Sequence, residues 1–158
     1  MSLLLSPLQA AQSSNAHSAG TDIFGFMQSE YAGCAAIFSD LDGCLISSDT
    51  VLPGVTQLVS EAGDRLWIVS NNSTDTSRSL AARLKGLGLA IAHEHILLAD
   101  EVTIRKIAKQ IPGIRITLYA SELLTELAVE LGLKPCRGEK SDIPQLALLT
   151  RDPAFFNA

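Results

Sequence analysis

Two aspartates one residue apart have the side chains and the spacing needed for phosphoryl transfer. Asp40 and Asp42 lie in residues 38–45, FSDLDGCL, behind an apolar run and ahead of a glycine. A carboxylate at the end of a strand can attack phosphorus and form an aspartyl-phosphate, so Asp40 is the candidate nucleophile. Asp42 can protonate the leaving oxygen and then accept a proton from the water that hydrolyses the intermediate. Gly43 permits the sharp turn that brings both carboxylates to one site, and it is also a candidate residue for binding the substrate phosphate.

A second polar group follows another apolar run, in residues 66–74, LWIVSNNST. Ser70 and the backbone amides at the start of the following helix can bind phosphoryl oxygens. Asn71 or Asn72 can add an amide donor. Each motif alone is typical of a turn or a helix cap. The two together, each behind an expected buried strand, favour one shared site.

The charge distribution of the chain favours a divalent cation as cofactor. A carboxylate is repelled by a phosphate dianion unless a cation screens the charge, and Mg²⁺ does this by binding oxygens of both groups. Every charged side chain up to Asp64 is acidic, and lysine and arginine begin at Arg65. This segment lacks the basic stripe of a nucleic-acid binder. Chance could also produce such a distribution in a mildly acidic protein.

Three further residues are weaker candidates for the site. His93 and His95 could bind a metal, but no third ligand of the usual kind is close in sequence. We therefore interpret them as loop or strand-edge histidines. Asp49 is either a solvated loop residue, which we prefer, or an acid that supports the site.

Strand-like and helix-like segments alternate along the chain. Short apolar runs predict strands at 35–39, 66–69, 95–99, 114–119 and 145–150. Helical periodicity predicts helices at 23–31, 55–62, 101–110 and 122–131. A further helix is expected to end at residue 87. Thr74 or Asp75 is the expected cap of the helix that ends at 87, and Asp100 and Ser121 cap the last two. The alternation predicts an α/β fold with a partial doubly wound parallel sheet and helices on both faces. Ligands of such sheets bind beyond the carboxyl ends of the strands, where Asp40 and Ser70 both fall.

With these residues the chain resembles the haloacid dehalogenase (HAD) superfamily of phosphotransferases. Asp40, Asp42 and Gly43 are similar to its DxDG motif, and Ser70 with the two following asparagines is similar to its second motif. The short distance between the motifs resembles the branch in which a cap domain is inserted after the second motif. Residues 52–55, LPGV, resemble the para-nitrophenyl phosphatase and phosphoglycolate phosphatase group of that branch.

The resemblance implies roles for these residues and a division of the chain. Asp40 is the nucleophile and Asp42 the general acid and base, the Asp40 side chain and the Asp42 backbone carbonyl hold Mg²⁺, and Ser70 binds the phosphoryl group. A HAD-like Rossmannoid core is expected, with residues 1–22 as a disordered extension, 23–111 as the N-terminal part of the core, and 112–158 as the start of an α/β cap.

The lysine of the family's third motif and its final metal-binding acid follow the cap, and neither has a match here. Four lysines lie outside any matching context and are interpreted as surface residues: Lys106, Lys109, Lys134 and Lys140. The chain is therefore expected to be C-terminally truncated. It is either a magnesium-dependent phosphatase of small phosphomonoesters, or a fragment of one, or a catalytically inactive relative. Lys109 or Lys134 folding into the site, or a second chain, could complete it.

The composition of the chain indicates what type of protein it is and in which compartment it is expected. The 158 residues are 47% hydrophobic and 18% charged, which is typical of a globular domain with a core. No apolar run approaches the roughly 20 residues of a membrane span, and no signal or transit peptide is recognisable. Three cysteines without a CxxC pair, Cys34, Cys44 and Cys136, are interpreted as small buried thiols in a reducing compartment.

We expect a cytoplasmic protein with a small phosphorylated metabolite as partner, no nucleic acid and no membrane. Its partial cap or an open sheet edge could support a homo-oligomer.

Overall fold

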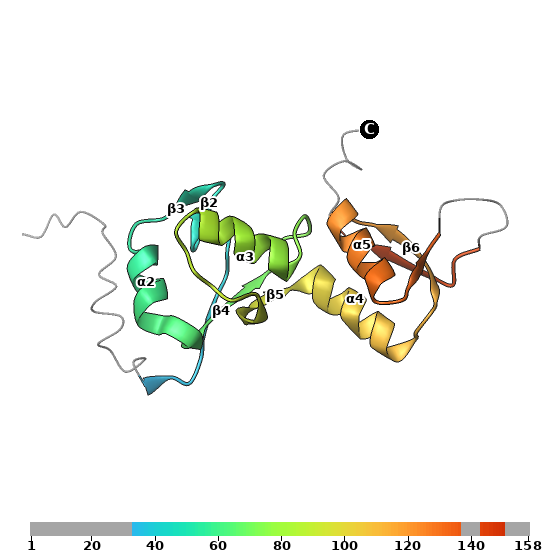
Figure 1. Ribbon diagram of the computed structural model, residues 1–158, viewed down its shortest axis with the longest axis horizontal. Coiled ribbons are helices and arrows are strands. Elements are labelled where there is room, and N and C mark those ends of the chain that lie inside the picture. The colour runs from blue at the N-terminus through green and yellow to red at the C-terminus, as the bar shows by residue number, and fades with distance from the viewer. Residues whose placement is uncertain (1–32, 137–142, 151–158) are drawn as a thin grey trace, which may run out of the picture.

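The computed structural model describes residues 33–136 and 143–150, which form two lobes joined by one helix (Figure 1). The first lobe contains β1 (Ile37–Ser39), β2 (Ile46–Ser47), β3 (Thr50–Val51), α2 (Val55–Ala62), η2 (Gly63–Arg65), β4 (Leu66–Ser70), α3 (Ser77–Gly86), η3 (His93–His95) and β5 (Ile96–Leu98). The joining helix is α4 (Ala99–Gln110), and the second lobe contains β6 (Arg115–Tyr119), α5 (Glu122–Glu130), β7 (Lys134–Pro135) and β8 (Leu146–Leu149). The expected extension at 1–22 and helix at 23–31 lie outside the described residues.

The first sheet is parallel and has the strand order β1-β4-β5. Ser39 is opposite Ile68, and Ser70 is opposite Leu98. Each new strand is added on the same side of the previous one, and right-handed crossovers then place both connecting helices on the same face. Side chains from α2, α3 and the inner face of the sheet accordingly form one core, together with side chains of β2 and of the connecting loops: Leu41, Leu45, Ile46, Val55, Ile68, Leu80, Leu84, Leu89, Ile96 and Leu98.

The opposite face of this sheet is not covered by any helix of the described residues. Phe38, Val69 and Leu97 are exposed there. The Trp67 ring stacks on His95, with 4.6 Å between ring centroids, and lies 6.4 Å from the ring of Phe38. In a doubly wound sheet, helices reach the second face only through strands added on the other side of the first strand. The described strands all extend from one side of β1, which accounts for the open face.

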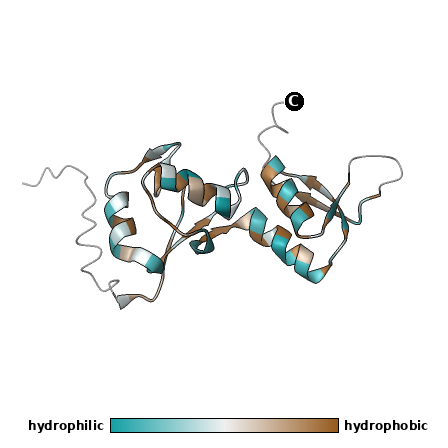
Figure 2. Ribbon diagram, in the orientation of Figure 1, coloured by the Kyte–Doolittle hydropathy of each residue, from teal (hydrophilic) through white to brown (hydrophobic). Residues whose placement is uncertain are grey.

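The second sheet is also parallel, with β6 between β7 and β8. Its core contains residues from α4, α5 and the sheet: Ile104, Ile114, Ile116, Leu124, Leu127, Ala128 and Leu133. Each helix alternates between hydrophobic and hydrophilic positions along its length (Figure 2). Because Ile104 of α4 lies in this second core, α4 packs with the second lobe although it begins at the last strand of the first.

The α/β fold class predicted from the sequence is confirmed, with parallel sheets and helices in alternation. Helix α2 has the bounds expected from the sequence, and Gly63 ends it. Ser121 caps α5 as expected, with its hydroxyl accepting a hydrogen bond from the amide of Leu124. The two-residue strands β2, β3 and β7 were not predicted, because they are too short to show a period of two.

Two predicted helix caps are wrong. Helix α3 is capped by Thr76 rather than by Thr74 or Asp75, because Thr76 and Ser79 form a reciprocal capping box. Asp100 does not cap α4: the helix begins at Ala99, with Leu98 as its cap residue, so Asp100 lies inside the first turn. The third strand also begins later than predicted, at Ile96, because His95 belongs to a 3₁₀ turn.

Candidate active site

The first candidate loop begins directly after β1 and is closed by its own backbone. The carbonyl of Leu41 accepts hydrogen bonds from the amides of Leu45 at 2.9 Å and Ile46 at 3.1 Å, and all three side chains are buried. The Gly43 amide donates to the carbonyl of Ile46 at 2.7 Å. Three apolar side chains therefore anchor a tight loop in the core, while Asp40 and Asp42 remain exposed.

Backbone conformation explains why glycine occupies position 43. Gly43 has a φ of 79°, in the left-handed region that side chains disfavour. The side chain of Asp40, three residues earlier, is oriented by the loop itself, because its Oδ1 accepts a hydrogen bond from the Leu41 backbone amide at 2.8 Å. The second carboxylate oxygen of Asp40 is engaged in no hydrogen bond with the described residues. Since Oδ1 accepts a single hydrogen bond, both oxygens keep a lone pair, so one can bind a cation while the other faces phosphorus.

The second candidate loop, residues 70–76, is organised by Asn72. The side-chain oxygen of Asn72 accepts hydrogen bonds from the amides of Thr74 and Asp75, both at 3.0 Å. The backbone amide of Asn72 donates a hydrogen bond to Oγ of Ser70 at 3.1 Å, and Ser70 is only 5% exposed. Asn72 therefore holds the loop in shape. Asn71 is exposed, and of the two asparagines it is the one whose side-chain amide is available to a ligand.

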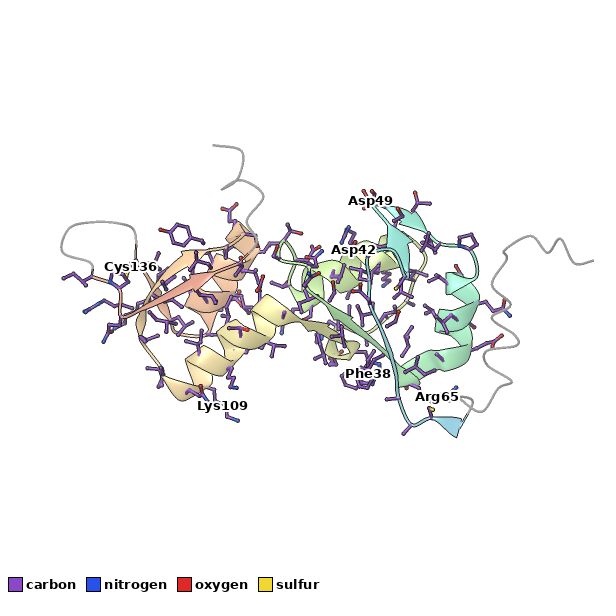
Figure 3. The ribbon with its side chains drawn as sticks, turned by 180° about the vertical axis from the view of Figure 1, so that it is seen from behind. Phe38, Asp42, Asp49, Arg65, Lys109 and Cys136 are labelled. Atoms are coloured by element: carbon purple, nitrogen blue, oxygen red, sulfur yellow. The ribbon has the colours of Figure 1, made fainter. Side chains whose placement is uncertain are left out.

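The two loops lie at the same edge of the sheet. Because β1 and β4 pair in parallel with Ser39 opposite Ile68, Asp40 comes one residue after the pairing ends and Ser70 is the last residue of its strand. The carboxyl ends of adjacent parallel strands share one edge. Figure 3 shows Asp42 at one end of the first lobe and Phe38 and Arg65 at the other.

An arginine on α3 joins the second loop to the β2–β3 hairpin. Arg83 forms ion pairs with Asp75 at 3.1 Å and with Asp49 at 3.3 Å. Asp75 also accepts hydrogen bonds from Ser79 and, at 3.4 Å, from Asn72. The Asp49 side chain is 78% exposed, which agrees with a solvated loop residue. Asp75 and Arg83 were missed in the sequence, because nothing in their spacing marks them as partners.

A carboxylate of α4 also holds the start of α3. Glu101 of α4, which is buried, accepts hydrogen bonds from the amide and the hydroxyl of Ser77. Arg105 pairs with the same carboxylate at 2.7 Å. Glu101 was predicted from the sequence only as the first residue of a helix, with no role in the site. A helical Glu-Arg pair at i, i+4 is a surface pattern in most proteins.

The remaining candidates take no part in this arrangement. His93 pairs with Glu94, and His95 stacks on Trp67. Among residues 33–136 and 143–150, no group of three or more His, Cys, Asp or Glu side chains is arranged to hold a metal. No helix of the described residues is long and apolar enough to cross a membrane.

The expected burial of the cysteines is wrong for two of the three. Cys34 and Cys44 are exposed, and Cys136 is half-buried. Cys44 is exposed because the loop turns its apolar neighbours Leu41 and Leu45 into the core instead.

The lysines considered as completing the site lie away from it, and Lys85 is exposed in the last turn of α3. Lys106 and Lys109 are exposed on α4, and Lys134 is exposed on β7. Figure 3 shows Lys109 in the second lobe, far from Asp42. Lys140 lies outside the described residues. The alternative in which Lys109 or Lys134 folds into the site is not seen in this structure.

The chain matches one known protein family over most of its described residues. A sequence model of the haloacid dehalogenase-like hydrolases matches residues 37–134, which include both candidate loops. The chain therefore belongs to the haloacid dehalogenase-like hydrolase family.

Individual relatives are phosphatases of greater length. The chain is 28% identical over 99 residues to D-glycerol 3-phosphate phosphatase of Mycobacterium tuberculosis, a match that covers 62% of this chain and 28% of that protein. The crystal structure of glycerol phosphate phosphatase from the same organism in complex with magnesium is similar with a TM-score of 0.64 and 25% identity, over 75% of this chain and 36% of that one. The structure of p-nitrophenyl phosphatase from Archaeoglobus fulgidus is similar with a TM-score of 0.56 and 33% identity. The match covers 64% of this chain and 40% of that one. The chain thus spans between a quarter and two fifths of the length of these relatives, and its neighbours include the p-nitrophenyl phosphatases that the sequence indicated.

Proposed function

We propose that this chain carries the nucleophile and phosphoryl-binding loops of a magnesium-dependent phosphatase of small phosphomonoesters. The observation that carries the proposal is the parallel pairing of β1 with β4, which brings Asp40 and Ser70 to one sheet edge. Membership of the haloacid dehalogenase-like hydrolases supports the reaction class.

The proposed reaction has two steps. In the first, the Asp40 carboxylate attacks phosphorus, the bond to the ester oxygen breaks, and Asp42 gives its proton to the departing alcohol. In the second, Asp42 takes a proton from water, the water oxygen bonds to phosphorus, and phosphate leaves as the Asp40 carboxylate is regenerated. The Ser70 hydroxyl and the side-chain and backbone amides of the exposed Asn71 donate hydrogen bonds to the phosphoryl oxygens.

The residues present fit Mg²⁺ as the cofactor. Mg²⁺ prefers oxygen ligands, keeps several waters and is held by few protein groups together with substrate phosphate. One free carboxylate oxygen of Asp40 and the backbone carbonyl of Asp42 are the ligands we propose, and both residues are exposed. When bound, the ion neutralises the repulsion between carboxylate and phosphate. The magnesium complex of the Mycobacterium tuberculosis relative supports this choice.

The substrate is proposed to be a small phosphomonoester of the kind named for the relatives, such as a glycerol phosphate. We also propose that residues 23–111 belong to the core and residues 112–158 begin a cap. The separate sheet β7-β6-β8 supports a distinct second unit, although the hydrophobic core of that unit also takes in Ile104 of α4, which lies before residue 112. Because a cap encloses the substrate in such an arrangement, substrate choice depends on residues of the second lobe.

Two further expectations remain proposals. The exposed apolar face at Phe38 and Val69 could support a homo-oligomer, which light scattering of the purified chain would detect as a mass above that of one chain. The exposed thiols of Cys34 and Cys44 support a cytoplasmic location, and fractionation of cells expressing the chain would test it.

The proposal is tested by hydrolysis of p-nitrophenyl phosphate at high protein concentration. Asp40→Asn should abolish Mg²⁺-dependent release of nitrophenol, because an amide cannot act as the nucleophile. Asp64→Asn is the matched control, since Asp64 is an exposed aspartate before β4, at the opposite end of that strand from Ser70. Release that persists in Asp40→Asn, or in excess chelator, would contradict the assignment. Absence of release from the unaltered chain would favour the alternative of an inactive relative.

A further inference from the structure

Glu101 is a buried carboxylate with both oxygens engaged. It is 4% exposed, although glutamate is rarely buried unless it is paired. One oxygen accepts hydrogen bonds from Nε of Arg105 at 2.9 Å, from Nη2 of Arg105 at 2.7 Å and from the Ser77 hydroxyl at 3.1 Å. The other accepts from the Ser77 backbone amide. Removing one partner of such a buried group leaves the others without compensation.

The contact with Ser77 acts on the start of α3. Ser77 is the first residue of that helix, and the first amides of a helix have no partner within it. Thr76 already accepts from the Ser79 amide, and Glu101 supplies the acceptor for the Ser77 amide. A negative charge at this end is also favoured by the helix dipole. Since residues 70–76 immediately precede it, the start of α3 sets where the phosphoryl-binding loop ends.

Glu101 belongs to an element that packs in the other lobe. Helix α4 carries Glu101 in its first turn and Ile104 one turn later, in the core of the second lobe. Figure 1 shows α4 lying between the two lobes. Thr76, Arg78, Glu101, Arg105 and residues of α5 line a pocket of about 310 Å³ at this junction. One helix therefore connects the second core to the start of α3.

We propose that Glu101 is a positioning residue for phosphoryl transfer. It fixes the first turn of α3, and with it the loop 70–76, against the helix that packs with the second lobe. Its effect on phosphate rests on the proposed function, whereas its effect on the loop does not. Without Glu101 the Ser77 amide loses its acceptor. The loop 70–76 is then no longer held in the one arrangement that places Ser70 and Asn71 for phosphoryl oxygens.

The first test follows the Ser77 amide by nitrogen–proton NMR of the 158-residue chain. An amide that donates to a carboxylate is part of a strong, charge-assisted hydrogen bond. In Glu101→Ala the Ser77 amide proton should move upfield, and hydrogen exchange should accelerate from Asn71 to Ser77. Glu101→Gln should restore part of the protection, because its amide oxygen can still accept from Ser77. Glu126→Gln is the control, since Glu126 is exposed and lines the same pocket.

Acceleration spread evenly over β1, β4 and β6 would show a global loss of stability and overturn the proposal. So would unchanged exchange at residues 71–77.

The second test separates the two loops. In Glu101→Ala we expect inorganic phosphate, titrated in the presence of Mg²⁺, to bind about tenfold more weakly, equivalent to about 1.4 kcal/mol. Mg²⁺ affinity, followed at the amides of Asp40 and Asp42, should not change, because the first loop makes no contact with Glu101. Equal loss of both affinities, or of neither, would overturn the positioning role. If the unaltered chain binds neither ligand at these loops, the proposed function fails, and the exchange result still decides what Glu101 does.

Discussion

Asp40 and Ser70 stand at the carboxyl ends of two strands that pair in parallel, Asp40 one residue past the end of β1 and Ser70 at the last position of β4. Their environments differ. Ser70 is buried and its hydroxyl accepts from the Asn72 amide, whereas Asp40 is exposed and one of its oxygens accepts from the Leu41 amide. We propose that the Ser70 hydroxyl and the Asp40 carboxylate, which lie at the same edge of the sheet, act together in phosphoryl transfer.

The conformation of the first loop predicts opposite effects of alanine at two glycines. Gly43→Ala should lower the free energy of unfolding by about 1 kcal/mol, because position 43 has a φ of 79°. Gly86→Ala should raise it by about 1 kcal/mol, because Gly86 lies inside α3. An added Cβ meets no atom within 4 Å at either position, so the backbone alone decides the sign. Urea unfolding followed by Trp67 fluorescence measures both changes. Stabilisation by Gly43→Ala would contradict the described loop.

Burial of Asp100 predicts a pH dependence of stability. Burial raises the pKa of this carboxyl above its ordinary value of 3.8. Between 3.8 and the raised pKa the folded chain holds a proton that the unfolded chain has released, so this group lowers stability as the pH rises through that window. The cost is fully present at neutral pH. Asp100→Asn should therefore stabilise the chain at neutral pH, and the difference should vanish below pH 3.8. Thermal unfolding at a series of pH values checks this, and a constant difference would refute it.

The two ion pairs of Arg83 should differ in strength. Asp75 is 15% exposed and Asp49 is 78% exposed, and solvent screens the more exposed pair more strongly. Double-mutant cycles with Arg83→Gln should give a coupling of about 1 kcal/mol with Asp75→Asn and less than about 0.5 kcal/mol with Asp49→Asn. Urea unfolding supplies the four free energies of each cycle. A stronger coupling to Asp49 would mean that the hairpin, and not the loop 70–76, is what Arg83 holds.

The 158-residue chain assayed alone should be a poor catalyst. The described lysines are all exposed: Lys85 lies in the last turn of α3, Lys106 and Lys109 lie on α4, and Lys134 lies on β7. Losing one electrostatic donor commonly costs about 10²–10³ in rate. Steady-state assays with Mg²⁺ against several phosphomonoesters should therefore give turnover far below a typical enzyme's roughly 1–10³ per second. Turnover within that range would show that a further cationic side chain is not needed.

The sequence predicted most of what periodicity and backbone chemistry determine. The strand at Leu66, the bounds of α2 and the cap at Ser121 all follow from local patterns. It could not reveal contacts between distant segments. Glu101 was predicted only as a helical residue, because its partner Ser77 is brought to it by packing. The Thr76 cap was missed because Thr74 and Asp75 are equally good cap residues, and only the engagement of Asp75 with Ser79 and Arg83 decides among them.

The central claim is that Asp40 accepts a phosphoryl group in a reaction that needs Mg²⁺. The most direct measurement is to incubate the chain with p-nitrophenyl phosphate and Mg²⁺, quench it in acid, and locate the phosphoryl group by peptide mass spectrometry. We predict a single phosphorylated residue, Asp40, with the modification absent in excess chelator and in Asp40→Asn but present in Asp64→Asn. A phosphoryl group on any other residue, or one formed on Asp40 without a divalent cation, would contradict the account.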